Sequence, residues 1–401
     1  MKHLKAMEES YAEWVTRQIR QSRGSDGDLI MLFNSSTPEP SALLRDIVLT
    51  AFRNGMPPTY ATTMGGGNRL VRTLLAERYG VATRQVCCTT GASAALMLLL
   101  KVLVQPGDDV LVETPGFDLF SLFVVDRGAH VVPFARTGDR YDIDPERVAC
   151  ILTPRTRLII VSNLHNPSGF PISRQSLAAL ADIAERYGLY VVVDEVYRDY
   201  LNGPDRPPAA VSLSPRMISV SSMTKIWGLS TLRCGWIVGA PDLMARVQDW
   251  ASTFDFGLSN LTHALAACVL QQAGRFDTFS QEHVRIFGDI FKNFFDKWKR
   301  EGLVEGQVPD FGCIRFPVLT DIRDTLRFSE WLAESERVIV APGEFFGAPG
   351  HVRLGFASDP ARLAAGLERF SNGLRAYGRQ CRDAGSKPTV KQHSGTAICR
   401  N

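Results

Sequence analysis

The sequence predicts an α/β fold, in which a mostly parallel, doubly wound sheet is accompanied by a smaller α+β domain. Between about Val86 and Ala240, short β-rich runs alternate with helical patterns, and this alternation is typical of βαβ units. The runs 158–161 and 191–193 are wholly apolar, as expected for strands covered on both faces of a parallel sheet. From about Thr278 the pattern changes to a long amphipathic helix, short strands and a closing helix, which indicates the second domain.

The elements of the large domain follow one another along the chain. We expect strands at residues 110–112, 130–134, 158–162, 190–193, 217–221 and 235–238, and helices at 92–104, 175–187 and 241–250. Several strands end directly in polar residues, as in Ser162-Asn163 and Asp194-Glu195. Because open α/β sheets bind ligands at the carboxyl ends of their strands, these ends are the first place to look for a site.

The domain limits follow from the same patterns. We assign residues 46–283 to the large domain, and residues 1–45 with 284–379 to a small domain that both chain ends form. Residues 380–401 are polar and predict a disordered tail.

Composition excludes several classes of protein. The 401 residues carry 45 Lys and Arg against 42 Asp and Glu, and 45% are apolar, which excludes a disordered, collagen-like or disulfide-scaffold protein. A net charge of +3 does not favour nucleic acid or an anionic membrane. The eight cysteines form no Cys-x-x-Cys or paired Cys/His spacing, so we expect free thiols in a cytoplasmic protein, without zinc. The N-terminus lacks a signal peptide's apolar stretch, and the apolar run 92–100 is too short to span a bilayer.

The strongest chemical signal is the segment Ser222-Met-Thr-Lys225. Arg233 lies eight residues after Lys225. A lone lysine at a strand end would normally extend along the surface into water. Here Ser222 and Thr224 flank it, and hydroxyls together with a guanidinium form a phosphate site. Partial burial lowers the pKa of a lysine amine and makes it a better nucleophile toward an aldehyde. A phosphate site beside such an amine indicates pyridoxal 5′-phosphate as the cofactor.

Asp194 and Tyr197 follow a second apolar strand. A buried carboxylate needs a cation or a hydrogen-bond donor, because an unpaired buried charge is costly. Taken alone, Asp194 reads as a helix N-cap. Beside Lys225, it matches the partner of a protonated pyridine nitrogen, which keeps the ring an electron sink.

Two turns complete the candidate site. Asn166 begins an Asn-Pro-Ser-Gly turn, and Asn166 and Tyr197 both lie just past strand ends, where they can donate to the phenolic oxygen of the cofactor. Gly91, Ala92 and Ser93 open a helix, whose N-terminal N–H groups form an anion site that glycine lets the backbone approach. This turn is not a P-loop, since no Gly-Lys-Ser/Thr follows it.

These segments, in this order and spacing, resemble the class I/II aminotransferase family of fold-type I pyridoxal-phosphate enzymes, from about Asp28 to about Arg375. The resemblance implies that Lys225 is the Schiff-base lysine, which also moves the substrate proton. It implies that Asp194 is the pyridine-nitrogen partner. The cofactor phosphate would lie in a cup formed by Gly91, Ala92, Ser93, Ser222, Thr224 and Arg233, with Asn166 and Tyr197 on the ring oxygen.

The same resemblance assigns three further residues. Phe117 matches the aromatic residue that stacks on the pyridine ring, although many Phe residues are simply buried. Tyr60 matches the tyrosine that reaches the phosphate of a neighbouring subunit, which implies a homodimer with shared active sites. Arg353 resembles the arginine that binds the substrate α-carboxylate through a bidentate fork, and Asn166 is also expected to bind the substrate.

Two departures from the family pattern lie where the substrate is chosen. The family's Gly-x-Pro near the substrate carboxylate is here Ser36-Thr-Pro, so Ser36 is expected to narrow the pocket or to add a hydrogen bond. The segment after Tyr60 contains extra residues around Gly65, Gly66 and Gly67.

The resemblance implies an aminotransferase that exchanges an amino group between an L-amino acid and a 2-oxo acid by a ping-pong mechanism. The alternative is another reaction at the same site, by a lyase, a replacement or cyclisation enzyme, or an amino-acid oxidase, acting on a specialised amino acid. The expected partners are small molecules and a second copy of the chain, with no nucleic acid and no membrane. Trp227, Phe254 and Phe256 are candidates for an apolar pocket, and core packing explains them equally well.

Overall fold

The centre of the computed structural model is an eight-stranded sheet, and the structure describes residues 9–23, 28–254, 257–356 and 359–385. The strands run in the order β2-β9-β8-β7-β6-β3-β4-β5. Neighbouring strands pair in parallel except around β9 and β5, which are antiparallel to their neighbours. The bounds are β2 (Val86–Thr89), β3 (Asp109–Thr114), β4 (His130–Thr137), β5 (Asp142–Ile143), β6 (Thr156–Ser162), β7 (Tyr190–Asp194), β8 (Met217–Ser222) and β9 (Gly235–Val238).

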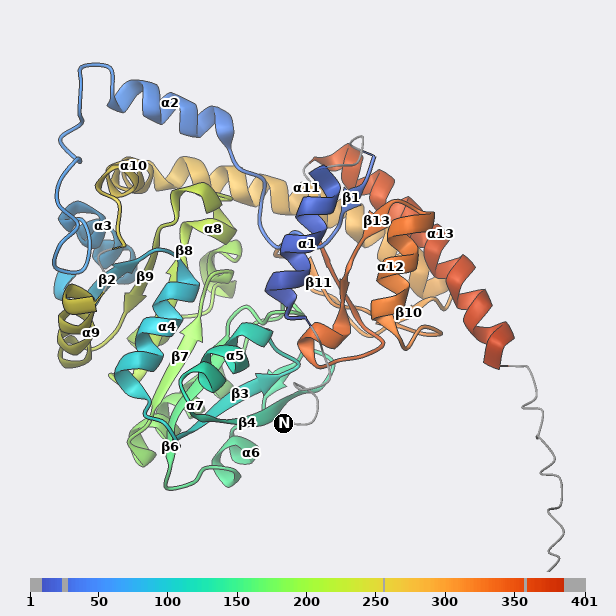
Figure 1. Ribbon diagram of the computed structural model, residues 1–401, viewed down its shortest axis with the longest axis horizontal. Helices are drawn as coiled ribbons and strands as arrows, with labels where there is room; N and C mark the ends of the chain where they lie inside the picture. The colour runs from blue at the N-terminus through green and yellow to red at the C-terminus, as the bar shows by residue number, and fades with distance from the viewer. Residues whose placement is uncertain (1–8, 24–27, 255–256, 357–358, 386–401) are drawn as a thin grey trace, which may run out of the picture.

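Side chains of this sheet alternate between two buried faces. Val110 and Leu158 pack on one face against α4, α5 and α9, whereas Leu111 and Ile159 pack on the other against α6 and α7. Figure 1 shows these helices around the sheet. Their bounds are α4 (Ala92–Leu103), α5 (Asp118–Asp126), α6 (Pro145–Cys150), α7 (Arg174–Tyr187) and α9 (Pro241–Phe254). The doubly wound sheet predicted from wholly apolar strands is therefore confirmed.

The two ends of the chain meet in the second body of structure. β1 (Ile30–Met31) pairs in parallel with β13 (Val338–Ile339), so the segment before α2 joins the C-terminal part. A small antiparallel sheet has the order β11-β15-β14, and β10 pairs with β12. The remaining strands are β10 (Val304–Glu305), β11 (Ile314–Arg315), β12 (Val318–Leu319), β14 (Ala341–Pro342) and β15 (Val352–Gly355).

Long helices cross both predicted domain limits. α11 (Ala273–Arg300) runs without a break across residue 283, and α13 (Pro360–Gly385) continues past residue 379. The domain limits stay a prediction, and the segment 386–401 lies outside the described residues.

The other helices are α1 (Tyr11–Arg23), α2 (Ser41–Ala51), α3 (Arg69–Tyr79), α8 (Met223–Ile226), α10 (Asn260–Gln271) and α12 (Thr325–Ser335). α2 and α3 pack against α10 at the β2 side of the sheet (Figure 1). Among the helices of the described ranges, none has the length and apolar composition that crossing a bilayer requires.

Candidate active site

The carboxyl ends of three neighbouring parallel strands meet at one edge of the sheet. β6 ends at Ser162, β7 at Asp194 and β8 at Ser222, and Ser162 lies opposite Asp194 in the register. Asn166 follows the first of these ends, and Lys225 follows the third on the short helix α8. The sheet thus brings together predicted residues from three separate segments.

Lys225 is partly buried, and its Nζ donates a hydrogen bond to Ser35 Oγ over 2.9 Å. Burial, together with the positive charge of Arg353, lowers the pKa of this amine to about 8. Part of the amine is therefore unprotonated near neutral pH, as a nucleophile or proton acceptor requires.

Asp194 is buried at the end of β7, where its Oδ1 accepts a hydrogen bond from the Val196 N–H over 3.2 Å. Burial raises the pKa of this carboxyl to about 6, and the charge of Lys225 opposes the rise. A carboxylate in this position is suited to hold a cation, because a counter-charge offsets the cost of its burial.

Tyr197 is buried beside these two groups, and its hydroxyl lies near Ser35. Burial raises the pKa of the Tyr197 hydroxyl well above its usual range, so this group stays protonated and can donate. The ring stacks on Tyr200 with centroids 6.1 Å apart, and the Tyr200 hydroxyl donates to the Lys225 carbonyl oxygen over 2.6 Å. Ser35 and Tyr200 therefore fix the lysine segment from two sides.

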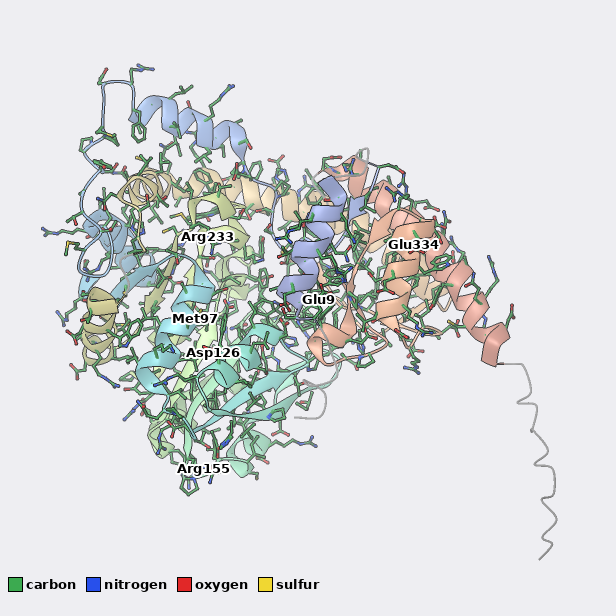
Figure 2. The ribbon with its side chains drawn as sticks, in the orientation of Figure 1. Glu9, Met97, Asp126, Arg155, Arg233 and Glu334 are labelled. Carbon is green, nitrogen blue, oxygen red and sulfur yellow. The ribbon has the colours of Figure 1, made fainter. Side chains whose placement is uncertain are left out.

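A cradle for an anion lies at the N-terminus of α4. Gly91 precedes this helix with a φ of 117°, and a Cβ added there would lie 3.0 Å from the Arg233 guanidinium. A Cβ on Gly235 would lie 2.4 Å from the Gly91 carbonyl carbon, so both glycines keep the backbone close. Arg233 (labelled in Figure 2) is exposed, and no carboxylate of the described residues pairs with it. Free N–H groups at a helix N-terminus beside a guanidinium suit a phosphate.

The other residues predicted for this cup have different contacts. Ser222 is buried, and its Oγ accepts from the Thr224 N–H over 3.4 Å as the N-cap of α8. Ser93 is exposed, whereas Ala92 and Thr224 are partly buried. Their contact with a phosphate stays a prediction.

Arg353 lies on β15 and is only 1% exposed. Its Nη1 donates to Asn166 Oδ1 over 2.8 Å, and its Nη2 donates to the Tyr11 hydroxyl and to the Phe33 carbonyl oxygen. Its Nε is buried without a partner in the described part of the chain. A buried guanidinium that keeps an unused donor and forms no salt bridge with a carboxylate of the described residues is placed to receive an anion.

A chain of contacts holds Asn166 in place from the sheet side. The Asn166 N–H donates to Ser162 Oγ over 2.9 Å, and the N–H and hydroxyl of Ser162 donate to Glu113. Glu113 in turn pairs with Arg136 over 3.1 Å, and both side chains are fully buried. This chain runs from β4 to the turn and fixes the amide that contacts Arg353.

Two predicted aromatic residues lie at the margins of the site. Phe117 is the N-cap of α5 and makes an edge-on contact with Tyr11, with centroids 6.3 Å apart. Its stacking on a cofactor stays a prediction. Tyr60 is 43% exposed, so its ring extends beyond the body of this chain.

His165, for which the sequence suggests no role, is fully buried. Its Nε2 lies 2.8 Å from the Pro115 carbonyl oxygen, and its Nδ1 lies 2.7 Å from Ser168 Oγ. Burial holds the pKa of His165 well below its usual range. This imidazole therefore joins the Asn166 turn to the segment that carries Phe117.

The hydroxyl next to the lysine belongs to Ser35, one residue before the predicted Ser36. Ser36 is partly buried, and in the described residues its side chain makes no hydrogen bond. A Cβ on Gly67 would lie 2.5 Å from Cys88 Cβ on β2, so this glycine keeps its segment close to the sheet, and a role of Gly65, Gly66 and Gly67 in the pocket stays a prediction.

Trp227 belongs to the core. Its Nε1 donates to Asp277 on α11 over 2.8 Å, and Arg78 lies over its ring. The side chain of Phe254 and all of Phe256 lie outside the described residues.

Sequence reasoning missed two contacts of the site, Ser35 on Lys225 and Tyr11 on Arg353. Neither residue belongs to a motif. The spacing of Tyr11 and Trp14 indicates an amphipathic helix, but not the surface on which it docks.

Comparisons with known proteins agree with this geometry. A family model described as aminotransferase class I and II matches residues 41–370. The arginine–pyruvate transaminase of Pseudomonas aeruginosa is 28% identical over 375 residues, which cover 88% of this chain and 92% of that protein. The capreomycidine synthase of Streptomyces vinaceus is 29% identical over 319 residues, covering 78% and 80%.

The same fold occurs among solved structures. A single mutant of the aspartate aminotransferase of Thermus thermophilus matches with a TM-score of 0.80 at 25% identity, over 93% of this chain and 99% of that one. The family match begins at residue 41, so α1 lies outside it.

Proposed function

Because this chain belongs to the class I and II aminotransferases, a family of pyridoxal-phosphate enzymes, we propose that it moves an amino group from an L-amino acid to a 2-oxo acid at the site around Lys225. The main observation in support of this proposal is that three functional groups lie together at one edge of the sheet. These are an amine with a lowered pKa, the buried carboxylate of Asp194 and the buried guanidinium of Arg353.

The residues at this edge fit pyridoxal phosphate. When bound, this group supplies a carbonyl carbon that takes up the amino group and a ring that accepts electrons. Each polar part of the cofactor has a counterpart in the chain. The Lys225 amine would hold the carbonyl carbon, and the Asp194 carboxylate would hold the ring nitrogen. Asn166 and Tyr197 would donate to the ring oxygen, and the helix N-terminus at Gly91 together with the Arg233 guanidinium would hold the phosphate.

Lys225 also carries the proton that transamination must move. With a pKa of about 8, its Nζ can accept a proton near neutral pH and return it. The hydrogen bond to Ser35 and the bond from Tyr200 to the Lys225 carbonyl oxygen limit the positions that this amine adopts.

Arg353 orients the amino acid through its α-carboxylate. The Nε of Arg353 has no partner in the described residues, and Asn166 fixes the plane of the guanidinium. A carboxylate bound to a planar fork is held in one orientation, which aligns the Cα–H bond for proton removal.

One comparison favours a second candidate function. A relative is named capreomycidine synthase, a name that describes a synthesis and not an amino-group transfer. The same amine and carboxylate serve elimination, replacement, cyclisation or oxidation, because the choice depends on the pocket around the substrate.

The proposal includes a homodimer with shared sites. Exposed apolar side chains gather on α2, on the loop after it and on α10: Leu49, Met56, Tyr60, Met64 and Leu261. Exposed apolar side chains on neighbouring elements suit a second copy of the chain, with Tyr60 directed at the partner's phosphate cradle. The cysteines in the described residues are free thiols, which fits the cytoplasm as the location.

Single turnover tests the function. The enzyme loaded with pyridoxal phosphate is mixed with individual amino acids in the absence of any 2-oxo acid. Pyridoxamine phosphate formed in a 1:1 ratio to enzyme, with release of the matching 2-oxo acid, is the expected result. Ammonia release with the cofactor unchanged would instead assign one of the alternative reactions.

A further inference from the structure

Helix α1 lies outside the segment that matches the family, yet it contributes to the site. Figure 1 shows α1 between the central sheet and the C-terminal elements. Tyr11 and Trp14 are buried on its inner face, and they pack with Phe33 and Phe345 in one aromatic cluster. This helix therefore covers the side of the site where Arg353 lies.

The N-terminus of α1 is anchored next to the predicted cofactor contact. The Tyr11 N–H, a donor that the helix itself leaves unpaired, binds Asp118 Oδ2 over 2.8 Å. Asp118 is the first residue of α5 and directly follows Phe117. The carboxylate also suits the positive end of the helix dipole. Tyr11 is thus fixed at both its backbone and its ring.

The Tyr11 side chain makes two kinds of contact with Arg353. Its hydroxyl oxygen accepts a hydrogen bond from Nη2, and its ring centroid lies 4.9 Å from the guanidinium carbon. Phe346 lies 4.8 Å from the same carbon. The centroids of the two rings lie only 5.5 Å from each other, so both rings lie toward one side of the guanidinium and leave its other side for a ligand.

Two donors remain unused beside one edge of the Arg353 guanidinium. Nε and Nη2 form one edge of a guanidinium, and Nε has no partner in the described residues. The Tyr11 oxygen accepts from Nη2, so its own hydrogen is left to donate, and the described residues give it no acceptor. An anion at this edge meets the Nε–H and the Tyr11 O–H together.

We infer that Tyr11 is a substrate-binding residue, which donates its hydroxyl hydrogen to the α-carboxylate held by Arg353. This inference rests on the proposed function, because it takes the carboxylate to be that of an amino acid. It makes α1 part of the substrate site, whereas a purely structural role would limit Tyr11 to docking the helix.

Tyr11→Phe removes the hydroxyl and keeps the ring, so the helix can still dock. We expect the KM of the best amino acid from the single-turnover screen to rise about tenfold, with kcat within about threefold, since a hydrogen bond to a charged group is lost. With the amine that lacks only the carboxylate of that amino acid, Tyr11→Phe is expected to react at the same rate as the wild-type enzyme does. Thr16→Ala, which removes an exposed hydroxyl of the same helix, is the matched control.

A binding measurement decides the inference without turnover. Acetate, a carboxylate that cannot react, is titrated into the holoenzyme while the absorbance of the bound cofactor is followed. We expect Tyr11→Phe to bind acetate about tenfold more weakly than the wild type and Thr16→Ala to bind it equally well. Unchanged acetate affinity in Tyr11→Phe, or equal losses for the amino acid and the amine, overturns the inference. If the wild type converts no amino acid, the proposed function fails, and the acetate titration still decides the role of Tyr11.

Discussion

The cofactor side and the substrate side of this site are built in different ways. Asn166, Asp194 and Lys225 follow three neighbouring strands of one parallel sheet, so the register of that sheet places them. Tyr11 and Arg353 meet across 342 positions of sequence, one on α1 and the other on β15. The positions of the cofactor-side residues are determined by a single sheet, whereas those of the substrate-side residues are determined by the packing of both chain ends.

The two sides also differ in what holds them. On the cofactor side, burial shifts the pKa values of Asp194 and Lys225 toward each other, to about 6 and about 8. On the substrate side, two aromatic rings pack against one buried guanidinium. Substitutions on the cofactor side should therefore change chemistry and pH dependence, whereas those on the substrate side should change affinity.

The largest effect is expected at Lys225. Lys225→Ala should lower transamination by at least about 1000-fold, because both the nucleophile and the proton carrier are lost. Borohydride treatment followed by peptide mass spectrometry should find the cofactor on Lys225 in the wild type and on no lysine in the variant. Lys101→Ala, at an exposed lysine of α4, is the control and should behave as the wild type. Cofactor fixed to another lysine in Lys225→Ala would falsify the assignment.

Two equally buried arginines separate affinity from stability. Arg353 donates to two side chains and one backbone carbonyl oxygen and keeps a free Nε, whereas Nη1 of Arg315 on the paired strand β11 donates to three backbone carbonyl oxygens. Arg353→Lys should lower kcat/KM for the amino acid about 100-fold, because the free Nε–H of the planar guanidinium is lost, and should change the free energy of unfolding less than Arg315→Lys does.

Arg315→Lys should lower the stability of the protein and leave substrate affinity unchanged. It should cost roughly 2 kcal/mol of unfolding free energy, because buried carbonyl oxygens lose their donor, and leave KM near the wild-type value. Urea unfolding and steady-state kinetics on both variants check the pair. A large loss of stability in Arg353→Lys, with KM unchanged, would show that Arg353 serves the fold and not the substrate.

Asp194 should affect stability and cofactor binding in opposite directions. The ordinary pKa of this carboxyl is 3.8, and burial raises it to about 6 in the folded protein. The folded state then binds more protons between these values, so the cofactor-free protein loses stability as the pH rises from about 4 to about 6.

Asp194→Asn removes this cost. At pH 7 the cofactor-free variant should be about 2 to 3 kcal/mol more stable than the wild type, with no difference below about pH 4. The same variant should bind pyridoxal phosphate more weakly, since the ring nitrogen loses its counter-charge. Urea unfolding across this pH range gives the first effect and cofactor titration gives the second. Asp126→Asn, at an exposed carboxylate (labelled in Figure 2), is the control, and equal stability of Asp194→Asn and wild type at pH 7 would contradict the argument.

The sequence predicts the cofactor side better than the substrate side for a physical reason. Cofactor chemistry demands particular residue types at strand ends, so Lys225 and Asp194 stand out within a few positions of apolar runs. Tyr11 and Ser35 act through ordinary hydroxyls. Their roles depend on tertiary packing of α1 and of the segment before α2, which no local spacing encodes. The role of Glu113 could not be predicted from the sequence either, since its partner Arg136 lies on the neighbouring strand β4.

The smallest effect distinguishes two adjacent serines. Ser35 Oγ accepts from Lys225 Nζ, whereas the Ser36 side chain makes no hydrogen bond in the described residues. Ser35→Ala should lower kcat about three- to tenfold, the cost of one hydrogen bond that orients the amine, and Ser36→Ala should stay within about twofold of the wild type.

This pair of variants tests which of the two serine hydroxyls contributes more to the rate. The resemblance implies a substrate-facing residue at Ser36, which stays a prediction, whereas Ser35 is the residue that contacts the lysine. Single-turnover rates for both variants with the same amino acid decide between them. A larger loss in Ser36→Ala would mean that Ser36 contacts the substrate directly, as the resemblance implies, and that this contact matters more than the Ser35 hydrogen bond to the lysine.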